Sequence, residues 1–252
     1  MNIMISVSDF KDAVEAIWLK GKYKSSTTSK TDVVSNSCLC VLKTNQLAFY
    51  NGNDKCALNV NKNIEYPCPE DKEKMFIFDI EKAMKYLKTF KGDLYLRITD
   101  SNLMMKCNSS TARIPLLVEH TAIGLISKII NIDIKPPVVF GKTELPCQLM
   151  FNGKAFADAI KFCNVVGTAT FKINYSADSP QAIVSSRSFN RTEKASQSFV
   201  VINPNEESMT VEFSAPLDKF CNDEVMTIFS GDDKPILLIG TDRKLVIAPY
   251  VR

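Results

Sequence analysis

Cysteine and histidine are the residue types in this chain that could bind a metal ion or attack a substrate. The 252 residues include eight cysteines and a single histidine, His120. No two cysteines have the Cys-x-x-Cys spacing of zinc sites, and one imidazole gives little basis for a mixed Cys/His site. Cys38 and Cys40 alternate with Leu39, so they would share one face of a strand. We therefore expect buried, reduced thiols, with no metal site and no cofactor.

Paired carboxylates could perform acid–base chemistry, and adjacent pairs such as Glu206–Glu207 and Asp232–Asp233 occur. Both pairs lie in polar, turn-like stretches, where solvated carboxylates are the ordinary outcome. The chain also lacks a Gly-rich phosphate loop and a nucleophile elbow. We therefore expect no enzymatic activity and assign no catalytic residue.

Lysine side chains could contact the phosphates of a nucleic acid without reading its sequence. The clearest stripe is Lys82, Lys85 and Lys88, which falls opposite the apolar positions of one predicted helix. Solvated helix faces are often rich in lysine, so an ordinary surface is the alternative. The candidate DNA contacts are Lys11, Lys20, Lys82, Lys85, Lys88, Lys154, Lys161 and Lys219.

Helices must position these lysines, and each helix belongs to a repeated strand–helix–three-strand unit. The last copy, residues 210–252, is the easiest to read, and three similar copies precede it. Apolar spacings of three and four predict helices at 9–19, 80–90, 152–166 and 216–222. We expect Ser8 or Asp9 to cap the first helix, and Gly92 and Gly167 to end the second and third.

A proline-containing stretch separates the second copy from the third. Residues 120–146 hold an apolar patch, 123–132, followed by Pro136, Pro137 and Pro146, which argue against a helix or a central strand. We therefore predict two domains, 1–122 and 145–252, joined by an extended connector at 123–144. The predicted class is α+β, with two similar domains of two units each and helices on one face of antiparallel sheets.

The fourfold unit and the end of the chain resemble the sliding clamps of the proliferating cell nuclear antigen (PCNA) family. The resemblance rests on the connector, on Asp233–Leu238, on Lys244–Pro249 with its final Ala-Pro, and on the spacing of Gly153, Phe156, Ala157 and Gly167. It covers essentially the whole chain, and its length suits a two-domain clamp that forms trimers. The resemblance implies a DNA polymerase processivity factor: a homotrimeric ring that encircles duplex DNA, with its helices facing the hole.

The resemblance also implies partners and two further sets of site residues. The implied partners are double-stranded DNA bound without sequence preference, a DNA polymerase, a clamp loader and other replication and repair proteins that carry short peptide motifs. The implied peptide groove comprises Leu42, Gln46, Leu47, Ile132, Ile134, Pro235, Val246 and Pro249. The implied subunit interface pairs strand 112–118 with strand 182–188 of a neighbour, through Ala112, Arg113, Ile114, Leu116, Ile183, Ser185 and Arg187.

Two features depart from the family pattern. Leu245 and Val246 stand where family members usually have aromatic residues, and the chain is basic, with a net charge of +3 and a pI near 8.3. Both departures are typical of a divergent member, such as one of viral, phage or archaeal origin. They leave open a monomeric or dimeric processivity factor that grips DNA by charge, and a virion or scaffold protein that assembles through open sheet edges.

The sequence contains no apolar run near the 18 or so residues that span a bilayer, and its start does not read as a signal peptide. We therefore expect an intracellular protein of the nucleus, nucleoid or cytoplasm, in a reducing compartment.

Overall fold

The chain forms two compact units, described here one at a time. The computed structural model describes residues 2–19, 36–53, 55–65, 73–118, 126, 129, 132, 134–167, 170–188, 192–215 and 217–249. Unit 1 comprises Met1–Asp54 and Leu58–Ile126, and unit 2 comprises Lys55–Ala57 and Ser127–Arg252. The division after Ile126 falls within the stretch that the sequence marks as a connector.

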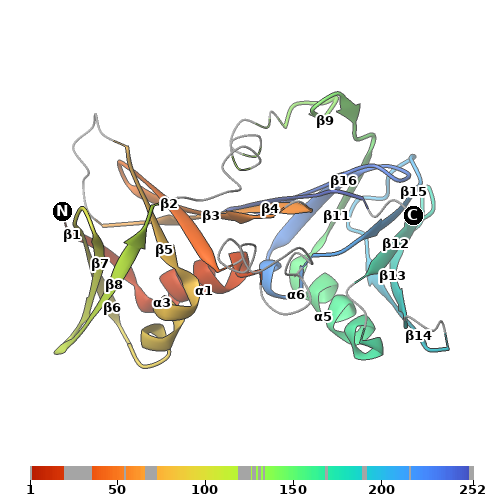
Figure 1. The fold of residues 1–252 in the computed structure, drawn as a ribbon. Coiled ribbons are helices and arrows are strands. Elements are labelled where there is room, and N and C mark those ends of the chain that lie inside the picture. Colours follow the sequence, from red (N-terminus) through yellow and green to blue (C-terminus); the bar gives the residue numbers. More distant parts are fainter. Residues whose placement is uncertain are drawn as a thin grey trace. The chain divides into compact units, whose positions relative to one another are not determined.

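The predicted fourfold strand–helix–three-strand unit is confirmed (Figure 1). The first copy is β1 (Asn2–Ser6), α1 (Val7–Ile17), β2 (Ser37–Lys43), β3 (Gln46–Gly52) and β4 (Cys56–Asn63). The second is β5 (Lys74–Asp79), α3 (Ile80–Leu87), β6 (Asp93–Ile98), β7 (Asn102–Cys107) and β8 (Ser110–Leu117). The third is β11 (Cys147–Asn152), α5 (Gly153–Cys163) with the 3-10 turn η2 (Asn164–Val166), β12 (Phe171–Tyr175), β13 (Gln181–Arg187) and β14 (Lys194–Val200). The fourth is β15 (Met209–Phe213), α6 (Leu217–Phe220), β16 (Val225–Ser230), β17 (Ile236–Ile239) and β18 (Arg243–Ile247).

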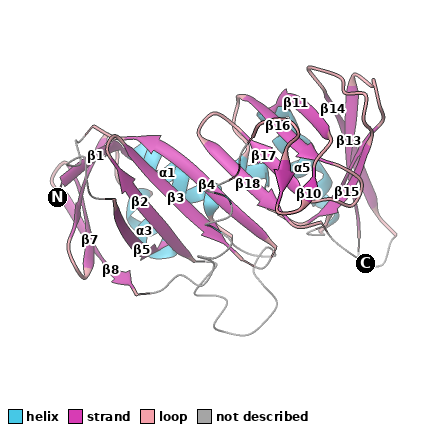
Figure 2. Ribbon diagram, turned by 90° about the horizontal axis from the view of Figure 1, so that it is seen from above, coloured by secondary structure: helices cyan, strands magenta, loops and turns pink. Residues whose placement is uncertain are grey.

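Unit 1 is an antiparallel sheet with α1 and α3 on one face. Its strand order is β1-β6-β7-β8-β5-β2-β3-β4, so the first strand of each copy, β1 or β5, pairs with a strand of the other copy (Figures 1 and 2). Phe10 of α1 fixes the helix layer, because its ring packs 5.2 Å from Phe49 of β3 and 5.9 Å from Phe78 of β5. Phe10, Phe49 and Phe78 are completely buried, so they form the centre of this core.

The opposite face of β2, β3 and β5 is buried as well. A cluster of Leu39, Val41, Ala48, Tyr50 and Ile77 lies there under Ile126, which is 1% exposed. Ile126 and Ile129 are both helical and buried, so the expectation of an extended connector without helix is wrong at these positions. The apolar patch precedes the prolines in sequence, and burying its isoleucines outweighs the prolines' effect, which is local.

The later part of the predicted connector forms a small hairpin. Strands β9 (Val139–Phe140) and β10 (Thr143–Glu144) pair with each other in antiparallel fashion around Gly141. Gly141 has a φ of 65°, a conformation that the tight turn requires and that glycine adopts at little cost.

Unit 2 packs α5 against two sheets. One contains β18-β17-β16-β11 and the other has the order β14-β13-β12-β15 (Figure 1). Phe156 of α5 lies between them, 4.9 Å from the ring of Phe151 on β11 and 5.0 Å from that of Phe199 on β14. The helix ends through η2 at Gly167, whose φ of 78° matches the predicted glycine stop.

Among the described residues, no helix is both long and apolar enough to cross a membrane.

Candidate nucleic-acid interface

The lysine stripe on α3 (Lys82, Lys85 and Lys88) is fully formed. Asp79 caps the helix by accepting a hydrogen bond from the Lys82 amide at 2.9 Å, and the apolar residues on the other face are at most 2% exposed. The periodicity therefore leaves all three ammonium groups in solvent. Among the described residues none of them has an ion-pair partner, so their charge is available to an anion.

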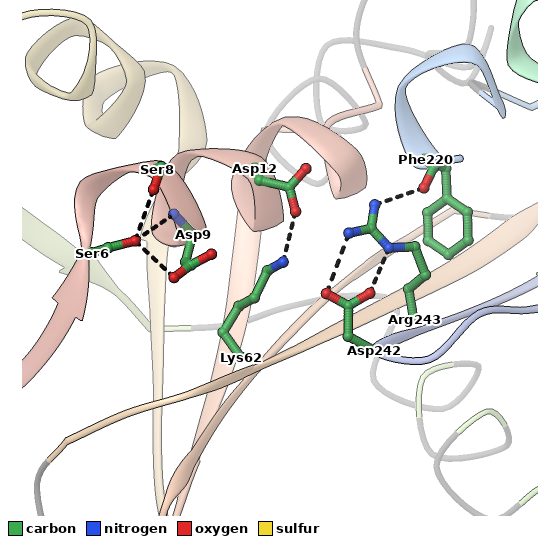
Figure 3. Close-up of polar contacts among 8 residues, drawn as sticks. All are labelled: Ser6, Ser8, Asp9, Asp12, Lys62, Phe220, Asp242 and Arg243. Atoms are coloured by element: carbon green, nitrogen blue, oxygen red, sulfur yellow. Dashed lines mark hydrogen bonds and ion pairs between the residues drawn. The ribbon is translucent and has the colours of Figure 1, made fainter. Parts of the chain in front are cut away.

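Helix α1 is fastened at its start by Ser6, and Ser8 and Asp9 are not the N-cap residues. The Ser6 hydroxyl accepts a hydrogen bond from the Asp9 amide at 3.0 Å and donates one to the Asp9 carboxylate at 2.7 Å (Figure 3). Helix α1 begins at Val7, two residues before the start of the predicted helix 9–19, so Ser6 is the last extended residue and has the cap geometry. On the same helix Asp12 pairs with Lys62 of β4 at 2.7 Å, while Lys11 is half-buried.

Helix α5 presents two of the predicted lysines, and both are exposed. Asn152 caps the helix by accepting from the Ala155 amide at 3.0 Å, which leaves Lys154 in the first turn. Lys161 is 3.1 Å from Asp158 in an ion pair that is about half-exposed, so water screens it. Lys154 thus offers an unshared charge, and Lys161 offers a partly neutralised one.

The start of α5 needs a glycine. The Gly153 amide donates to the Glu224 carbonyl at 2.8 Å, and a Cβ at this position would overlap the Asn222 carbonyl oxygen and come 2.7 Å from the Met226 sulfur. The close approach fixes α5 against the segment that follows α6.

Helix α6 has only four residues, and a buried arginine holds its end. Arg243 of β18 is 2% exposed and donates from Nη1 to the Phe220 carbonyl at 2.8 Å (Figure 3). Its Nε donates to Asp242 Oδ1 at 2.6 Å, and its guanidinium lies 5.9 Å from the Phe220 ring centre. This support for α6 was not predicted, because Arg243 begins its strand between Asp242 and Lys244, where a charged side chain is ordinarily exposed. Lys219, the predicted contact on α6, is exposed.

Seven of the eight predicted lysines therefore lie on four helices or at their ends, and Lys20 is outside the described residues. Three of them share one face of α3, two share α5, and one each lies on α1 and α6. These charges are dispersed over separate helices. Dispersed, solvated cations suit diffuse phosphate contacts.

The predicted partner-groove residues divide between the two units. In unit 1, Leu42 and Leu47 face each other across the β2–β3 hairpin and are at most 1% exposed, so they form core, while Gln46 is half-buried. In unit 2, Val246 is 4% exposed. The half-buried members of unit 2 are Ile132, Ile134, Pro235 and Pro249.

One predicted interface strand has to be corrected. Strand β13 pairs with β12 on one side and with β14 on the other, so Ile183, Ser185 and Arg187 lie within a sheet and have no free backbone edge. The outer strand is β14. The sequence did not reveal this because 194–200 is polar, with a weak alternation, whereas 182–188 alternates clearly.

The backbone of β14 has a free side. The Val201 amide donates to the Pro180 carbonyl, and the Ile202 amide donates in the opposite direction, to the Met150 carbonyl. These two bonds show which side of the strand the backbone groups of each residue face, because successive residues alternate. Odd-numbered residues therefore bond to β13, and the N–H and C=O groups of Ser196 and Ser198 point outward. No strand in the described part of the chain pairs with that side.

The predicted edge on β8 has a similar free side. Ser110–Pro115 pair with β7, and β5 reaches only Leu116 and Leu117 on the other side. The Leu116 amide donates to Ser101, so the outward backbone groups belong to Thr111 and Arg113. Ala112 and Ile114 are buried, whereas Arg113 is exposed and Leu116 is half-buried.

The described cysteines are buried or half-buried thiols. All are free in the described residues, and no group of three potential metal ligands occurs among them. Burial raises the pKa of Cys147 to about 12, helped by the nearby carboxylates of Glu207 and Asp232. Burial also raises the pKa of Cys40, whose Sγ lies 3.6 Å from that of Cys38. Such thiols stay protonated and unreactive near neutral pH.

Comparisons with known proteins agree with this architecture. No family model and no curated protein sequence matches the chain. The chain is similar in structure to the sliding clamp of Bacillus subtilis, with a TM-score of 0.74 and 14% identity over 100% of this chain and 64% of that one. It is also similar to the PCNA of A. fulgidus bound to the C-terminal region of FEN-1, with a TM-score of 0.69 and 16% identity over 100% and 98% of the two chains.

A third similar structure is the DNA polymerase III beta subunit of Thermotoga maritima, with a TM-score of 0.68 and 12% identity over 100% of this chain and 66% of that one. The chain thus spans about two thirds of the bacterial clamps that it matches and nearly all of the archaeal one. Full coverage of this chain, together with the fourfold unit, leads to one conclusion: the protein has the α+β fold of the DNA sliding clamps.

Proposed function

We propose that the protein is a DNA polymerase processivity factor that closes around duplex DNA as a ring of three copies. The observation that carries this proposal is the match of the whole chain to sliding clamps, with a two-domain match to A. fulgidus PCNA over 98% of that protein. The role is one of tethering, without covalent chemistry. The partners would be double-stranded DNA, a polymerase and a clamp loader, in replication and repair.

The helices would face the DNA through their exposed lysines. The stripe on α3 supplies three unshared charges, while Lys161 is partly neutralised by Asp158. Binding to phosphates alone is weak, independent of sequence and sensitive to salt. Weak contact suits a sliding protein, because enclosure rather than affinity would keep it on the DNA.

The ring would close where the free edge of β8 meets the free edge of β14 in another copy. Each edge offers unpaired backbone donors and acceptors, at Thr111 and Arg113 on one side and at Ser196 and Ser198 on the other. Antiparallel pairing of such edges would continue the sheet from one subunit to the next. The contact is head-to-tail, and a rotation of 120° would close it into three copies.

Partner proteins would dock by short peptides on the outer surface. The A. fulgidus structure contains the C-terminal region of FEN-1, which supports this mode of binding for the fold. In unit 2, Ile132, Ile134, Pro235 and Pro249 offer partly exposed apolar surface for peptide anchors. In unit 1, Gln46 is the half-buried member of the predicted set. Leu42, Leu47 and Val246 would contribute only if a bound peptide rearranged them, because they are buried.

Two measurements test the proposal together. Light scattering should give a solution mass of about 85 kDa, three times the 28.2 kDa of one chain. On primed circular single-stranded DNA, the protein with its loader should lengthen the products of the polymerase from the same source. A mass near 28 kDa at micromolar concentration, with no change in product length, would refute the proposal.

The basic charge favours one alternative, a monomeric or dimeric factor of the same fold that grips DNA electrostatically. The pI of 8.3 and net charge of +3 would support direct binding without a loader. Covalently closed circular duplex separates the two models. A charge-gripping factor binds it directly, whereas a closed ring requires a loader to open it.

A further inference from the structure

A concave surface lies on unit 1, on the side of β6 and β7 that faces away from the helices. It encloses about 630 Å³. The face is well defined because Leu94 and Leu96 point into the core while Asp93, Tyr95 and Arg97 are exposed. The residues that line it include Asp93, Tyr95, Arg97, Met104 and Lys106.

The register of the strands places an aromatic ring among cations. Tyr95 of β6 lies directly opposite Lys106 of β7, and Arg97 lies opposite Met104. Side chains of such cross-strand pairs are neighbours, with Cβ atoms about 5 Å apart. Tyr95 is 47% exposed, so one surface combines an open ring, a guanidinium, an ammonium and a thioether.

The charge of this surface is unbalanced. Asp93 is the one carboxylate among the lining residues, and it lies at the end of the strand. Neither Arg97 nor Lys106 forms an ion pair with any residue that the structure describes. Two unshared cations beside an exposed ring are complementary to an anion that also carries flat groups.

We infer that this surface binds single-stranded nucleic acid, with a base stacked on Tyr95 and phosphates near Arg97 and Lys106. A stacked base matches the ring, and an open sheet face leaves room for an extended strand. An acidic peptide fits less well, because β6 and β7 are each paired on both sides and offer no free backbone to an added strand. A duplex fits less well because its bases are already stacked on one another.

Binding of a single strand at this surface does not require a ring, and it can be measured separately from duplex binding and from the solution mass. Fluorescence anisotropy would measure binding of a labelled dT12 strand and of a blunt 12-base-pair duplex at low salt. Tyr95→Ala should weaken dT12 binding by about 5- to 100-fold, as expected for one lost stacking contact, and leave the duplex affinity unchanged. Tyr95→Phe, which keeps the ring, should bind dT12 like the parent protein.

Charge variants give the second arm. Lys106→Gln should lower the salt slope of log K for dT12 by about 0.7, the value for one phosphate contact on a single strand. Lys142→Gln, an exposed lysine of the β9–β10 turn, is the matched control and should leave that slope unchanged.

A combined Lys82, Lys85 and Lys88→Gln variant should weaken duplex binding but retain the effect of Tyr95→Ala on dT12. The inference is overturned if Tyr95→Ala and Lys106→Gln, both with native circular dichroism, bind dT12 as the parent does, or if a 12-residue polyglutamate displaces dT12 equally from parent and Tyr95→Ala.

Discussion

At the scale of single residues, Arg243 does the most to hold the shortest helix in place. Its guanidinium satisfies the terminal carbonyl of α6 and both carboxylate oxygens of Asp242, at distances of 2.6 to 3.3 Å. A buried cation is tolerated only when such partners are present. Sequence position alone would have suggested an ordinary strand residue.

Replacing Arg243 with Met should lower the free energy of unfolding by about 2–3 kcal/mol, because charged hydrogen bonds of this kind are lost. Urea unfolding followed by circular dichroism would measure the change. Lys142→Met, on an exposed turn, should change the stability by less than about 0.5 kcal/mol. Equal midpoints for the two variants would show that Arg243 is not a structural clamp.

Cys147 should make the stability depend on pH at alkaline values. Its pKa rises from about 9 in the unfolded chain to about 12 in the folded protein, so only the unfolded state loses the proton between these values. The stabilisation that comes from keeping this thiol protonated is therefore complete below pH 9. Above pH 9 the free energy of unfolding declines, by up to about 1.4 kcal/mol per pH unit.

Cys147→Ala should flatten that decline, although it lowers the stability at neutral pH. Urea titrations at pH 7, 9 and 10 would measure the difference. Val138→Ala, another buried truncation but one without a titratable group, should lower the free energy of unfolding by the same amount relative to the parent at all three pH values, and so keep the parent's decline. A parallel decline in both variants would contradict the assignment to this thiol.

At the scale of elements, α3 is the helix best suited to phosphate contact. Its three exposed lysines recur every three residues, opposite a face that is buried throughout. No other described helix presents three unshared lysines.

Changing Lys82, Lys85 and Lys88 to Gln should reduce the salt dependence of duplex binding. Each lost phosphate contact lowers the slope of log K against log salt by about 0.9, or roughly 2.7 for three. Anisotropy titrations between 50 and 200 mM salt would measure it, with Lys142→Gln in the β9–β10 turn as control. An unchanged slope would place the DNA contact elsewhere.

The elements that the sequence predicted well are those whose signal is local. Helix α3 is such a case, since its apolar spacing and Asp79 cap lie within a dozen residues. Features set by long-range pairing were missed. The outer position of β14 depends on which strand lies beside β13, and the burial of Ile126 depends on a sheet built from three distant segments. Neither is encoded in a short window of sequence.

At the scale of the whole molecule, the two free edges are where we propose that copies associate. Outward N–H groups on β14 belong to even-numbered residues, so a proline at Ser196 or Ser198 removes an outward donor and leaves the pairing with β13 intact. The edge can therefore be altered without dissolving the sheet.

The double variant Ser196→Pro, Ser198→Pro should have a solution mass near 28 kDa, against about 85 kDa for the parent. Ser196→Ala, Ser198→Ala keeps the backbone donors and should retain the parent mass. Light scattering at micromolar concentration would distinguish them, with circular dichroism as the check on folding. An assembled proline variant would exclude this edge as the contact.

The free edge of β8 is short. Strand β5 takes over at Leu116, Pro115 carries no N–H, and only Thr111 and Arg113 present outward donors before the hairpin turn. In the proposed ring, a contact with so few backbone hydrogen bonds, each contributing about 1 kcal/mol, would open spontaneously. Two batches of the protein carrying different fluorophores should therefore exchange subunits on mixing, and the lifetime of such a ring on a DNA circle would be set by how often any one of its three equivalent contacts opens.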